Sequence, residues 1–347
     1  MTEVNQKENV LLRKVQITGG STYIISIPKE WAKKLSIDKG EDILMEMLND
    51  GSIKLYNPKI KEEYNKKKIK EIDIDPRLLD SAIIMEIISA YLAGYNSIKL
   101  IFSPFISERV ENIVNTVRNK VVGLDIIEQT ENSILLQVVV DLTLISVKQA
   151  ANTMIKMLKT MTDDFINSIT NKDVETLSSI IKRDDVIDKL YLYISKQINL
   201  ALQGSVRTED LGMKDLKETV NIYTTIKSIE RIADHIVSMS SWLVDTIKDI
   251  EMPEELLNFI NKVKNEVIKV TNCIESEINI DELVKSYSNL HGLIENEIDL
   301  IKSLRGSKYF YELYPIFDGL RRALAYSIDI IESQVSLEML RNLNKKV

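Results

Sequence analysis

The chain has 347 residues, 44% of them hydrophobic and 28% charged, and its 11 glycines and 6 prolines favour long helices in two or three globular domains. One cysteine and two histidines exclude an internal disulfide and a Cys/His zinc site. The net charge is −7, but residues 1–70 carry about +4 and leave about −11 for the rest. A basic head on an acidic body is typical of a nucleic-acid-binding module joined to another domain.

Residues 10–58 have the pattern of short strands around one short helix. Pro28 suits the start of that helix, and Asn49-Asp50-Gly51 is a strong hairpin signal. About fifty residues in β-β-α-β-β order bury little apolar surface, so we expect a homodimer. The expected elements are strands near 11–17 and 23–27, a helix over 29–35, and strands over 43–47 and 53–56.

This order of elements resembles the SpoVT/AbrB swapped-hairpin domain, and so do the segments RKVQITGGSTYIISIPKEW at 13–31, GEDILMEM at 40–47 and GSIKLYNP at 51–58. The resemblance implies an intertwined homodimer that binds DNA through a basic face. Contacts to phosphates would position the protein without reading sequence. The alternative is an ordinary solvated face. The expected DNA-binding residues are Arg13, Lys14, Lys29, Lys33 and Lys34.

Residues 59–76 are rich in charge, and we interpret them as a linker whose lysine run at 66–68 could add non-specific attraction to DNA. Residues 77–141 predict a small α+β block of unknown purpose. No acid, histidine or glycine-rich loop in this block has catalytic spacing. The expected elements are a helix from Pro76 to Gly94, a strand over 98–102, a helix over 107–122, and strands over 124–128 and 134–140.

From residue 144 onward, apolar residues recur at helical spacing. The three methionines at 154, 157 and 161 form a stripe that we assign to the core, because no histidine or cysteine supports a copper site. The expected helices lie near 145–170, 173–203, 211–248, 252–275, 278–305 and 308–343.

Acidic pairs stand at the edge of the apolar stripe on three of these helices. Glu230 and Asp234 are i,i+4 neighbours, and Asp184 and Asp188 have the same spacing on the preceding helix. Glu295 and Asp299 repeat the pattern around Ile298, which indicates an internal repeat. Such pairs are ready oxygen ligands for a hard cation, and the alternative is a solvated acidic face.

The motif ERIADH at 230–235, with the pattern DxxIDxL at 184–190, resembles a PhoU domain. The resemblance implies a bundle of two three-helix repeats, metal clusters held by E/DxxxD motifs, and regulation of phosphate uptake. The metal would be iron, zinc, manganese or magnesium. The implied ligands are Asp184, Asp188, Glu230 and Asp234, with Glu295 and Asp299 as a second set.

The second repeat departs from the PhoU pattern, because Arg321 and Ala325 stand where metal ligands are expected. We hypothesise that Arg321 supplies a countercharge to Glu295 and Asp299 in place of a metal, since a guanidinium can grip carboxylates with two bonds.

The two histidines have different expected roles. We expect His235 to be a supporting or exposed residue rather than a metal ligand, because its helical angle lies beyond Asp234. We expect His291 to be a core histidine, because it lies on the apolar stripe one turn before Glu295.

The expected fold class is multidomain and mainly α. It comprises a swapped-hairpin β domain at 10–58, the α+β block at 77–141, and a six-helix bundle of two three-helix repeats, 144–248 and 252–343.

The leading function hypothesis is a DNA-binding regulator of phosphate uptake with a metal-binding sensor bundle. The alternative is an adaptor that contacts a phosphate transporter or a signalling protein, with the N-terminal domain serving for dimerisation. A di-iron enzyme is disfavoured, because neither histidine stands three residues after a glutamate. Charges interrupt every apolar run before about 18 residues, and the N-terminus lacks the apolar stretch of a signal peptide, so we expect a cytoplasmic protein.

Overall fold

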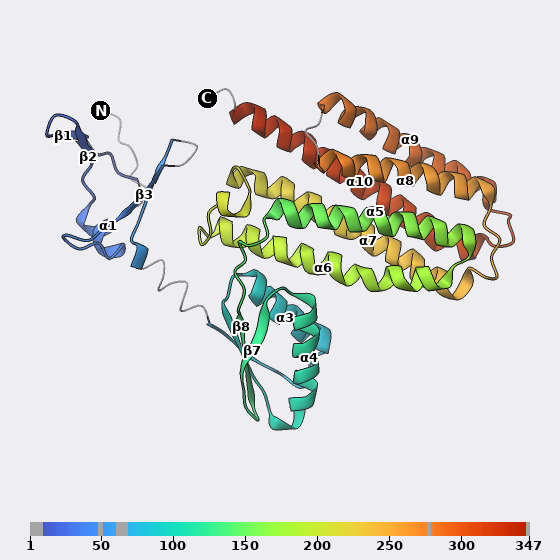
Figure 1. The fold of residues 1–347 in the computed structure, drawn as a ribbon, viewed down its shortest axis with the longest axis horizontal. Helices are drawn as coiled ribbons and strands as arrows, with labels where there is room; N and C mark the ends of the chain where they lie inside the picture. The colour runs from blue at the N-terminus through green and yellow to red at the C-terminus, as the bar shows by residue number, and fades with distance from the viewer. Residues whose placement is uncertain (1–9, 48–50, 60–68, 276–278, 345–347) are drawn as a thin grey trace. The chain divides into compact units, whose positions relative to one another are not determined.

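The computed structural model describes residues 10–47, 51–59, 69–275 and 279–344. The chain divides into two compact units, residues 1–67 and 68–347 (Figure 1). The described residues of the first unit include short strands and a short helix between them, and the second unit is mainly helical. Each unit is described below by itself.

The first unit contains two antiparallel hairpins with a helix between them. Gly19 and Gly20 turn the first hairpin with positive φ angles of 60° and 79°, a conformation that glycine adopts without strain. Residues 48–50, at the second predicted turn, lie outside the described residues. The elements are β1 (Gln16–Thr18), β2 (Thr22–Ile24), α1 (Lys29–Lys34), β3 (Leu44–Met47) and β4 (Ile53–Tyr56).

The first unit has no apolar core of its own among its described residues. Asn57 is the only buried residue there, whereas Leu12 is 91% exposed and Met47 81% exposed. Many other large apolar side chains are also open to solvent, among them Ile17 and Tyr23. A fold of this size with its apolar residues in water has little to stabilise it alone.

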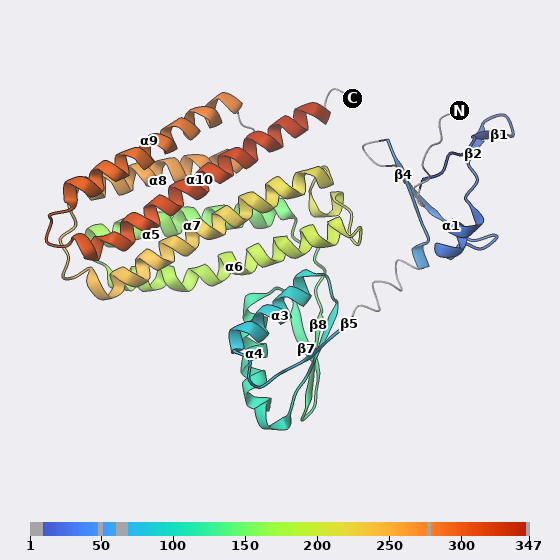
Figure 2. The same ribbon diagram turned by 180° about the vertical axis from the view of Figure 1, so that it is seen from behind.

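The second unit begins with a four-stranded sheet in the order β5-β6-β8-β7. β5 pairs with β6 in parallel, and the other pairings are antiparallel. Helices α3 and α4 cover one face of the sheet, as Figure 2 shows. The elements are β5 (Ile69–Asp73), α3 (Asp80–Leu92), β6 (Ser97–Ile101), α4 (Ser107–Lys120), β7 (Leu124–Gln129) and β8 (Ser133–Val138).

The predicted linker at 59–76 is wrong over 69–73, because these residues form β5 and belong to the sheet. Ile72 and Ile74 are buried in the core of the α+β block. β5 is an edge strand with one face open, so charged residues alternate with the apolar ones and the segment resembles a polar linker. Residues 60–68, which include the lysine run, lie outside the described residues.

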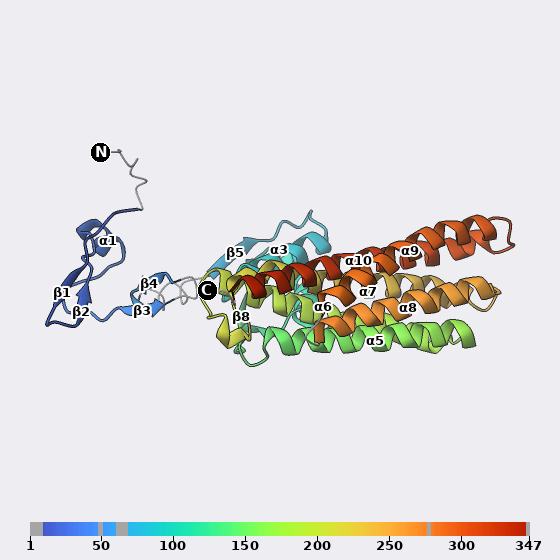
Figure 3. The ribbon, with the colours of Figure 1, turned by 90° about the horizontal axis from the view of Figure 1, so that it is seen from above.

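Six long helices follow, and Figure 3 shows them running side by side. Each of the first three helices packs against the other two, and the same holds for the last three, as expected for two three-helix repeats. One apolar core extends through both sets. Within the described residues, no helix combines the length and hydropathy that a membrane crossing requires. The helices are α5 (Val147–Asn171), α6 (Val174–Leu202), α7 (Thr219–Thr246), α8 (Glu254–Glu275), α9 (Ile280–Leu304) and α10 (Phe310–Asn344).

Helix α7 begins at Thr219, eight residues later than predicted. Two short 3₁₀ turns, Glu209–Leu211 and Leu216–Glu218, occupy the predicted first turns. Gly212 separates them with a φ of 72°, which ends a right-handed helix. The helical periodicity of 219–246 is clear in the sequence, whereas the boundary depends on these local turns.

Helix α6 also fastens the α+β block to the bundle. The Lys196 ammonium donates to the carbonyl of Tyr91 at 2.7 Å, Asn199 donates to that of Leu92 at 2.9 Å, and Gln203 donates to that of Ala93 at 2.9 Å. These three carbonyls lie at the C-terminal end of α3, where intrahelical donors run out, and that of Tyr91 also accepts from the Gly94 N–H at 3.1 Å. Three polar side chains of one helix therefore cap the C-terminus of another.

Candidate metal centre

Two neighbouring helices bring three aspartates together. On α6, the buried Ile187 fixes the rotation of the helix so that Asp184 and Asp188 lie one turn apart beside the core, while Asp185 is exposed. On α7, Ile229 and Ala233 are fully buried and fix the rotation in the same way. Asp234 therefore lies at the edge of the apolar stripe, as the sequence predicts, and in the structure it faces α6.

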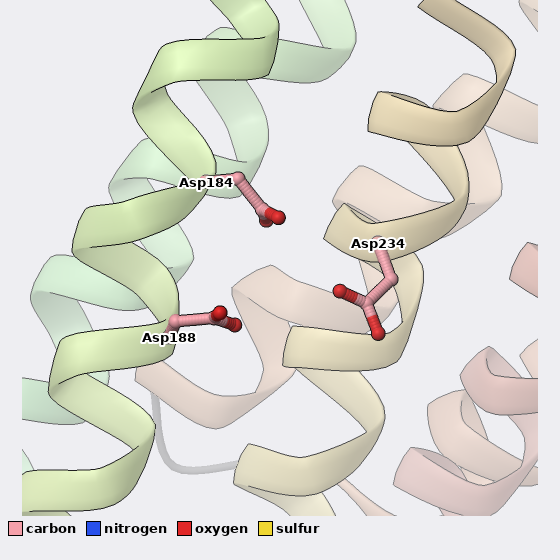
Figure 4. Close-up of side chains that lie close together, drawn as sticks. All are labelled: Asp184, Asp188 and Asp234. Atoms are coloured by element: carbon pink, nitrogen blue, oxygen red, sulfur yellow. The ribbon is translucent and has the colours of Figure 1, made fainter. Parts of the chain in front are cut away.

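The three carboxylates converge from both helices, with Asp184 and Asp188 pointing across to Asp234 (Figure 4). One oxygen from each of Asp184, Asp188 and Asp234 lies within 4.8 Å of the other two. In the part of the chain that the structure describes, this is the only group of three such side chains so placed. A divalent cation binds carboxylate oxygens in this arrangement.

Burial and mutual repulsion act on this group. The pKa of Asp184 is raised to about 7 by burial and by the negative charges of Asp188, Asp234 and Glu230. Burial also raises the pKa of Asp188, as does the charge of Asp234, while Lys120 and Lys227 oppose the shift. Asp184 Oδ1 is buried and has no hydrogen-bond partner among the described residues. A bound cation would satisfy this atom and offset the repulsion, so the residues present fit a metal ion.

Glu230, the fourth predicted ligand, is held differently. Its Oε1 accepts a hydrogen bond from the Lys227 ammonium at 2.7 Å, whereas its Oε2 is buried without a hydrogen-bond partner among the described residues and lies 3.8 Å from Arg231 Nε. Lys227 also sits over the ring of Tyr191, 4.5 Å from its centroid. The structure therefore places Glu230 beside the three-aspartate group and not within it. The lysine three residues earlier on the same helix is the signal that could have indicated this.

The two histidines lie outside the group of acids. The His235 ring stacks on Tyr326 of α10, with 5.8 Å between the ring centroids, and burial lowers its pKa. This placement agrees with a supporting role. His291 is exposed, so the prediction of a core histidine is wrong. Its ring lies beside Tyr287 at 4.6 Å on the outer surface of α9.

The second predicted ligand pair is wrong in its helical phase. Glu295 and Asp299 are both exposed, and Asp299 pairs with Lys302 at 3.0 Å. The inner face of α9 instead runs through Leu290, Leu293 and Glu297 in steps of three and four residues. The prediction took Ile298 as a core residue, but Ile298 is 43% exposed.

Arg321 does provide a countercharge, but to a different acid from the ones predicted. Its Nε donates to Glu297 Oε2 at 2.7 Å, and the Glu297 side chain is only 1% exposed. Glu297 could have been found from the spacing of the apolar residues before it. A buried, paired carboxylate stands here where the first repeat has its group of aspartates.

The five predicted DNA-binding residues are all exposed. Lys29, Lys33 and Lys34 belong to α1, and Arg13 and Lys14 precede β1. No side chain of another described element removes them from solvent, so they are placed where a phosphate backbone could reach them. Their contact with DNA stays a prediction.

Comparison with known protein families decides the nature of the helical bundle. The family model described as PhoU domain matches residues 151–243. The chain carries a PhoU domain. Asp184, Asp188, Glu230 and Asp234 all lie within the matched residues. The match to a PhoU domain agrees with the prediction of a regulatory or adaptor module rather than an enzyme.

The N-terminal unit matches a second family model, described as antidote-toxin recognition MazE, bacterial antitoxin, over residues 16–63. The chain is therefore a fusion of a MazE/AbrB-like domain and a PhoU domain, as predicted.

Two individual proteins are similar to this chain. A phosphate-specific transport system accessory protein PhoU homologue of Clostridium acetobutylicum is 29% identical over 126 residues, which are 34% of this chain and 53% of the relative. The chain thus spans about half the length of that curated relative. The crystal structure of the phosphate transport system regulatory protein PhoU from Streptococcus pneumoniae covers 55% of this chain and 93% of its own, with 16% identity and a TM-score of 0.45.

Proposed function

We propose that this protein is a DNA-binding regulator of phosphate uptake whose PhoU domain binds a divalent or transition metal ion. The observation that carries the proposal is the convergence of Asp184, Asp188 and Asp234 between two helices of a PhoU domain. The fused MazE/AbrB-like domain and the phosphate-transport relative support the regulatory and DNA-binding parts.

The metal would be held by Asp184, Asp188 and Asp234, with Glu230 adding negative charge at the margin. When bound, a cation supplies the positive charge that these carboxylates otherwise lack. Carboxylate ligands accept iron, zinc, manganese and magnesium. The protein's own part is to keep α6 and α7 in register so that three oxygens face one point.

The DNA-binding part would act as a homodimer. A partner copy would cover the exposed apolar residues of the first unit, and five exposed basic residues would then contact phosphates. Phosphate contacts made by lysine and arginine weaken steeply as salt rises.

Metal binding would be coupled to DNA binding if the bundle can adopt two geometries that bind the metal with different affinity. Neutralising the acids would favour close approach of α6 and α7, and α6 also fastens the α+β block. A coupling of this kind requires that the ligand bind the two geometries with different free energy.

The test is to select DNA duplexes that the full-length protein retains from a random pool, and then to measure affinity with and without manganese and phosphate. We expect specific retention near physiological salt and a metal-dependent change that Asp188→Asn/Asp234→Asn removes and Asp185→Asn preserves. Identical affinities with and without metal would contradict the coupling. Loss of all DNA binding at physiological salt would favour an adaptor that contacts a transporter or signalling protein.

A further inference from the structure

One end of the helical bundle encloses a cavity of about 720 Å³. Its lining comes from the starts of α5, α7 and α9 and from the ends of α8 and α10, so both three-helix repeats contribute. Helix α6, which carries two of the three aspartates of the candidate metal centre, contributes no residue. The cavity is therefore separate from that centre.

The walls of the cavity combine apolar surface with two polar pairs. Ile222, Ile226, Leu283 and Leu337 are among its apolar residues. Gln334 of α10 donates to the Thr225 hydroxyl of α7 at 2.9 Å, and both side chains are buried. This bond joins the two repeats across the cavity.

The second polar pair is an ion pair. Arg341 Nε of α10 donates to Glu218 Oε1 at 3.0 Å, and the Glu218 side chain is only 6% exposed. Arg341 is 38% exposed and also lines the cavity. Because the two opposite charges offset each other, this pair adds little net charge to the wall.

The charge of the lining favours an anion. Lys148, Lys214 and Arg341 line the cavity together with two carboxylates, Glu218 and Glu338, of which Glu218 is paired with Arg341. Three helices begin at this end and two end there, so their dipoles largely offset one another and the side-chain charges decide the sign.

We propose that this cavity binds an amphipathic anion, with an apolar body of about ten carbons and a carboxylate or phosphate head. Small-molecule sites typically enclose about 300–1,000 Å³, with apolar walls and a few polar groups that orient the ligand. The apolar residues named above would hold the body, and Arg341 and Lys148 would face the head. This binding site goes beyond the proposed metal and DNA sites. Because the ligand would contact both repeats, it would stabilise their packing against each other.

Cys273 provides a reporter, because it is the only cysteine in the chain, is buried, and lines the cavity. Burial raises the pKa of its thiol, so labelling by the neutral reagent methyl methanethiosulfonate is followed at pH 8.5. We expect decanoate and decyl phosphate to slow labelling at least fivefold in a saturable way. Decyltrimethylammonium and inorganic phosphate alone should change the rate less than twofold.

Two variants and an independent measurement make the test decisive. Lys148→Glu should weaken decanoate binding at least threefold, whereas Lys156→Glu, an exposed change on the same helix outside the cavity, should not. Calorimetry with the same probes reads binding without the thiol. The proposal is overturned if neither decyl anion gives saturable heat, if the decyl cation binds equally well, or if inorganic phosphate alone protects Cys273.

Discussion

Asp184 shows how the fold gives up stability to form the candidate metal centre. Its carboxylate stands among Asp188, Asp234 and Glu230 at the edge of the core, and one of its oxygens lacks a hydrogen-bond partner among the described residues. Like charges so placed raise the free energy of the folded state whenever they are ionised. A bound cation would offset this repulsion, and so does a proton on Asp184, whose pKa is raised to about 7.

The first prediction is that Asp184→Asn stabilises the metal-free protein in a pH-dependent way. The pKa of Asp184 is about 7 when folded and near 3.8 when unfolded. Between about pH 4 and pH 7, Asp184 is protonated in the folded state but ionised in the unfolded state. The stability of the parent therefore falls as pH rises through this range. The gain from Asp184→Asn should therefore grow over that range, and because solvent screens this half-buried group it should reach only about 1–3 kcal/mol at pH 8.

Thermal unfolding in excess chelator at several pH values measures this gain. Asp185→Asn is the matched control, because Asp185 is exposed on the same helix and should show no such pH dependence. A difference between Asp184→Asn and the parent that stays constant from pH 4 to 8 would refute this reading of the site.

The second prediction concerns the buried pair in the second repeat. Arg321→Met leaves Glu297 buried without its partner and should lower the free energy of unfolding by about 1–3 kcal/mol. Glu297→Leu/Arg321→Met should recover most of that loss, because removing both charges leaves none unpaired. Glu295→Gln, on the exposed side of the helix, should change stability by less than about 0.5 kcal/mol. Chemical denaturation of all four proteins tests the pair, and equal losses in the single and double variants would count against it.

For single residues, the sequence predicted where an acid lies on its helix better than which side chain it contacts. The i,i+4 spacing was enough to predict that Asp184 and Asp188 share one edge of their helix, whereas their convergence on Asp234 of another helix was implied by the resemblance to a PhoU domain. It could not show that Lys227 holds Glu230, since a flexible side chain chooses its partner in three dimensions. A rotation error of one residue on α9 was enough to select Glu295 and Asp299 instead of Glu297.

At the scale of elements, α6 is the helix that links the parts of the second unit. It carries Asp184 and Asp188 toward α7, and its later residues hold the end of α3. The role of the α+β block has no signature in its own sequence. Because the block is attached to the helix that carries Asp184 and Asp188, a movement of α6 would displace the block directly.

The third prediction is that Lys196→Met loosens the α+β block. The Lys196 side chain is 1% exposed, and its ammonium donates to the carbonyl of Tyr91 at the C-terminus of α3, where a positive charge is favourable. Its loss should lower stability by about 1–3 kcal/mol and speed amide hydrogen exchange in α3. Lys182→Met, an exposed change on the same helix, is the control. Unchanged exchange in α3 would show that the bond does not hold the block.

Helices were easier to predict than strands in this chain. The six long helices bury one stripe each, so their periodicity marks them clearly. β5 was missed because an edge strand of five residues with charged neighbours has too little pattern to stand out from a linker. Its pairing partner β6 lies 28 residues later, so only the tertiary fold identifies it.

At the scale of the whole molecule, the two units differ in how much apolar surface each buries by itself. The PhoU-containing unit has its own extended core, whereas the described residues of the first unit have almost none. A second copy of the chain is the simplest source of the missing burial.

The fourth prediction is that the full-length protein is a dimer through its first unit. Ile17→Asp/Met47→Asp places charges among the exposed apolar residues and should convert the dimer to a monomer in sedimentation equilibrium. Lys33→Gln/Lys34→Gln should stay dimeric but bind DNA more weakly, with a smaller salt dependence. A monomeric parent at micromolar concentration would rule out this role for the first unit.

The central claim is that the aspartates between α6 and α7 bind a metal ion, and metal content measured by mass spectrometry tests it most directly. The protein is purified without chelator or affinity metal, beside Asp188→Asn/Asp234→Asn and the matched control Asp185→Asn. We predict at least one divalent or transition metal ion per chain in the parent and the control, and none in the double variant. A metal-free parent, or equal metal in all three proteins, would contradict the claim and leave the acids as a solvated face.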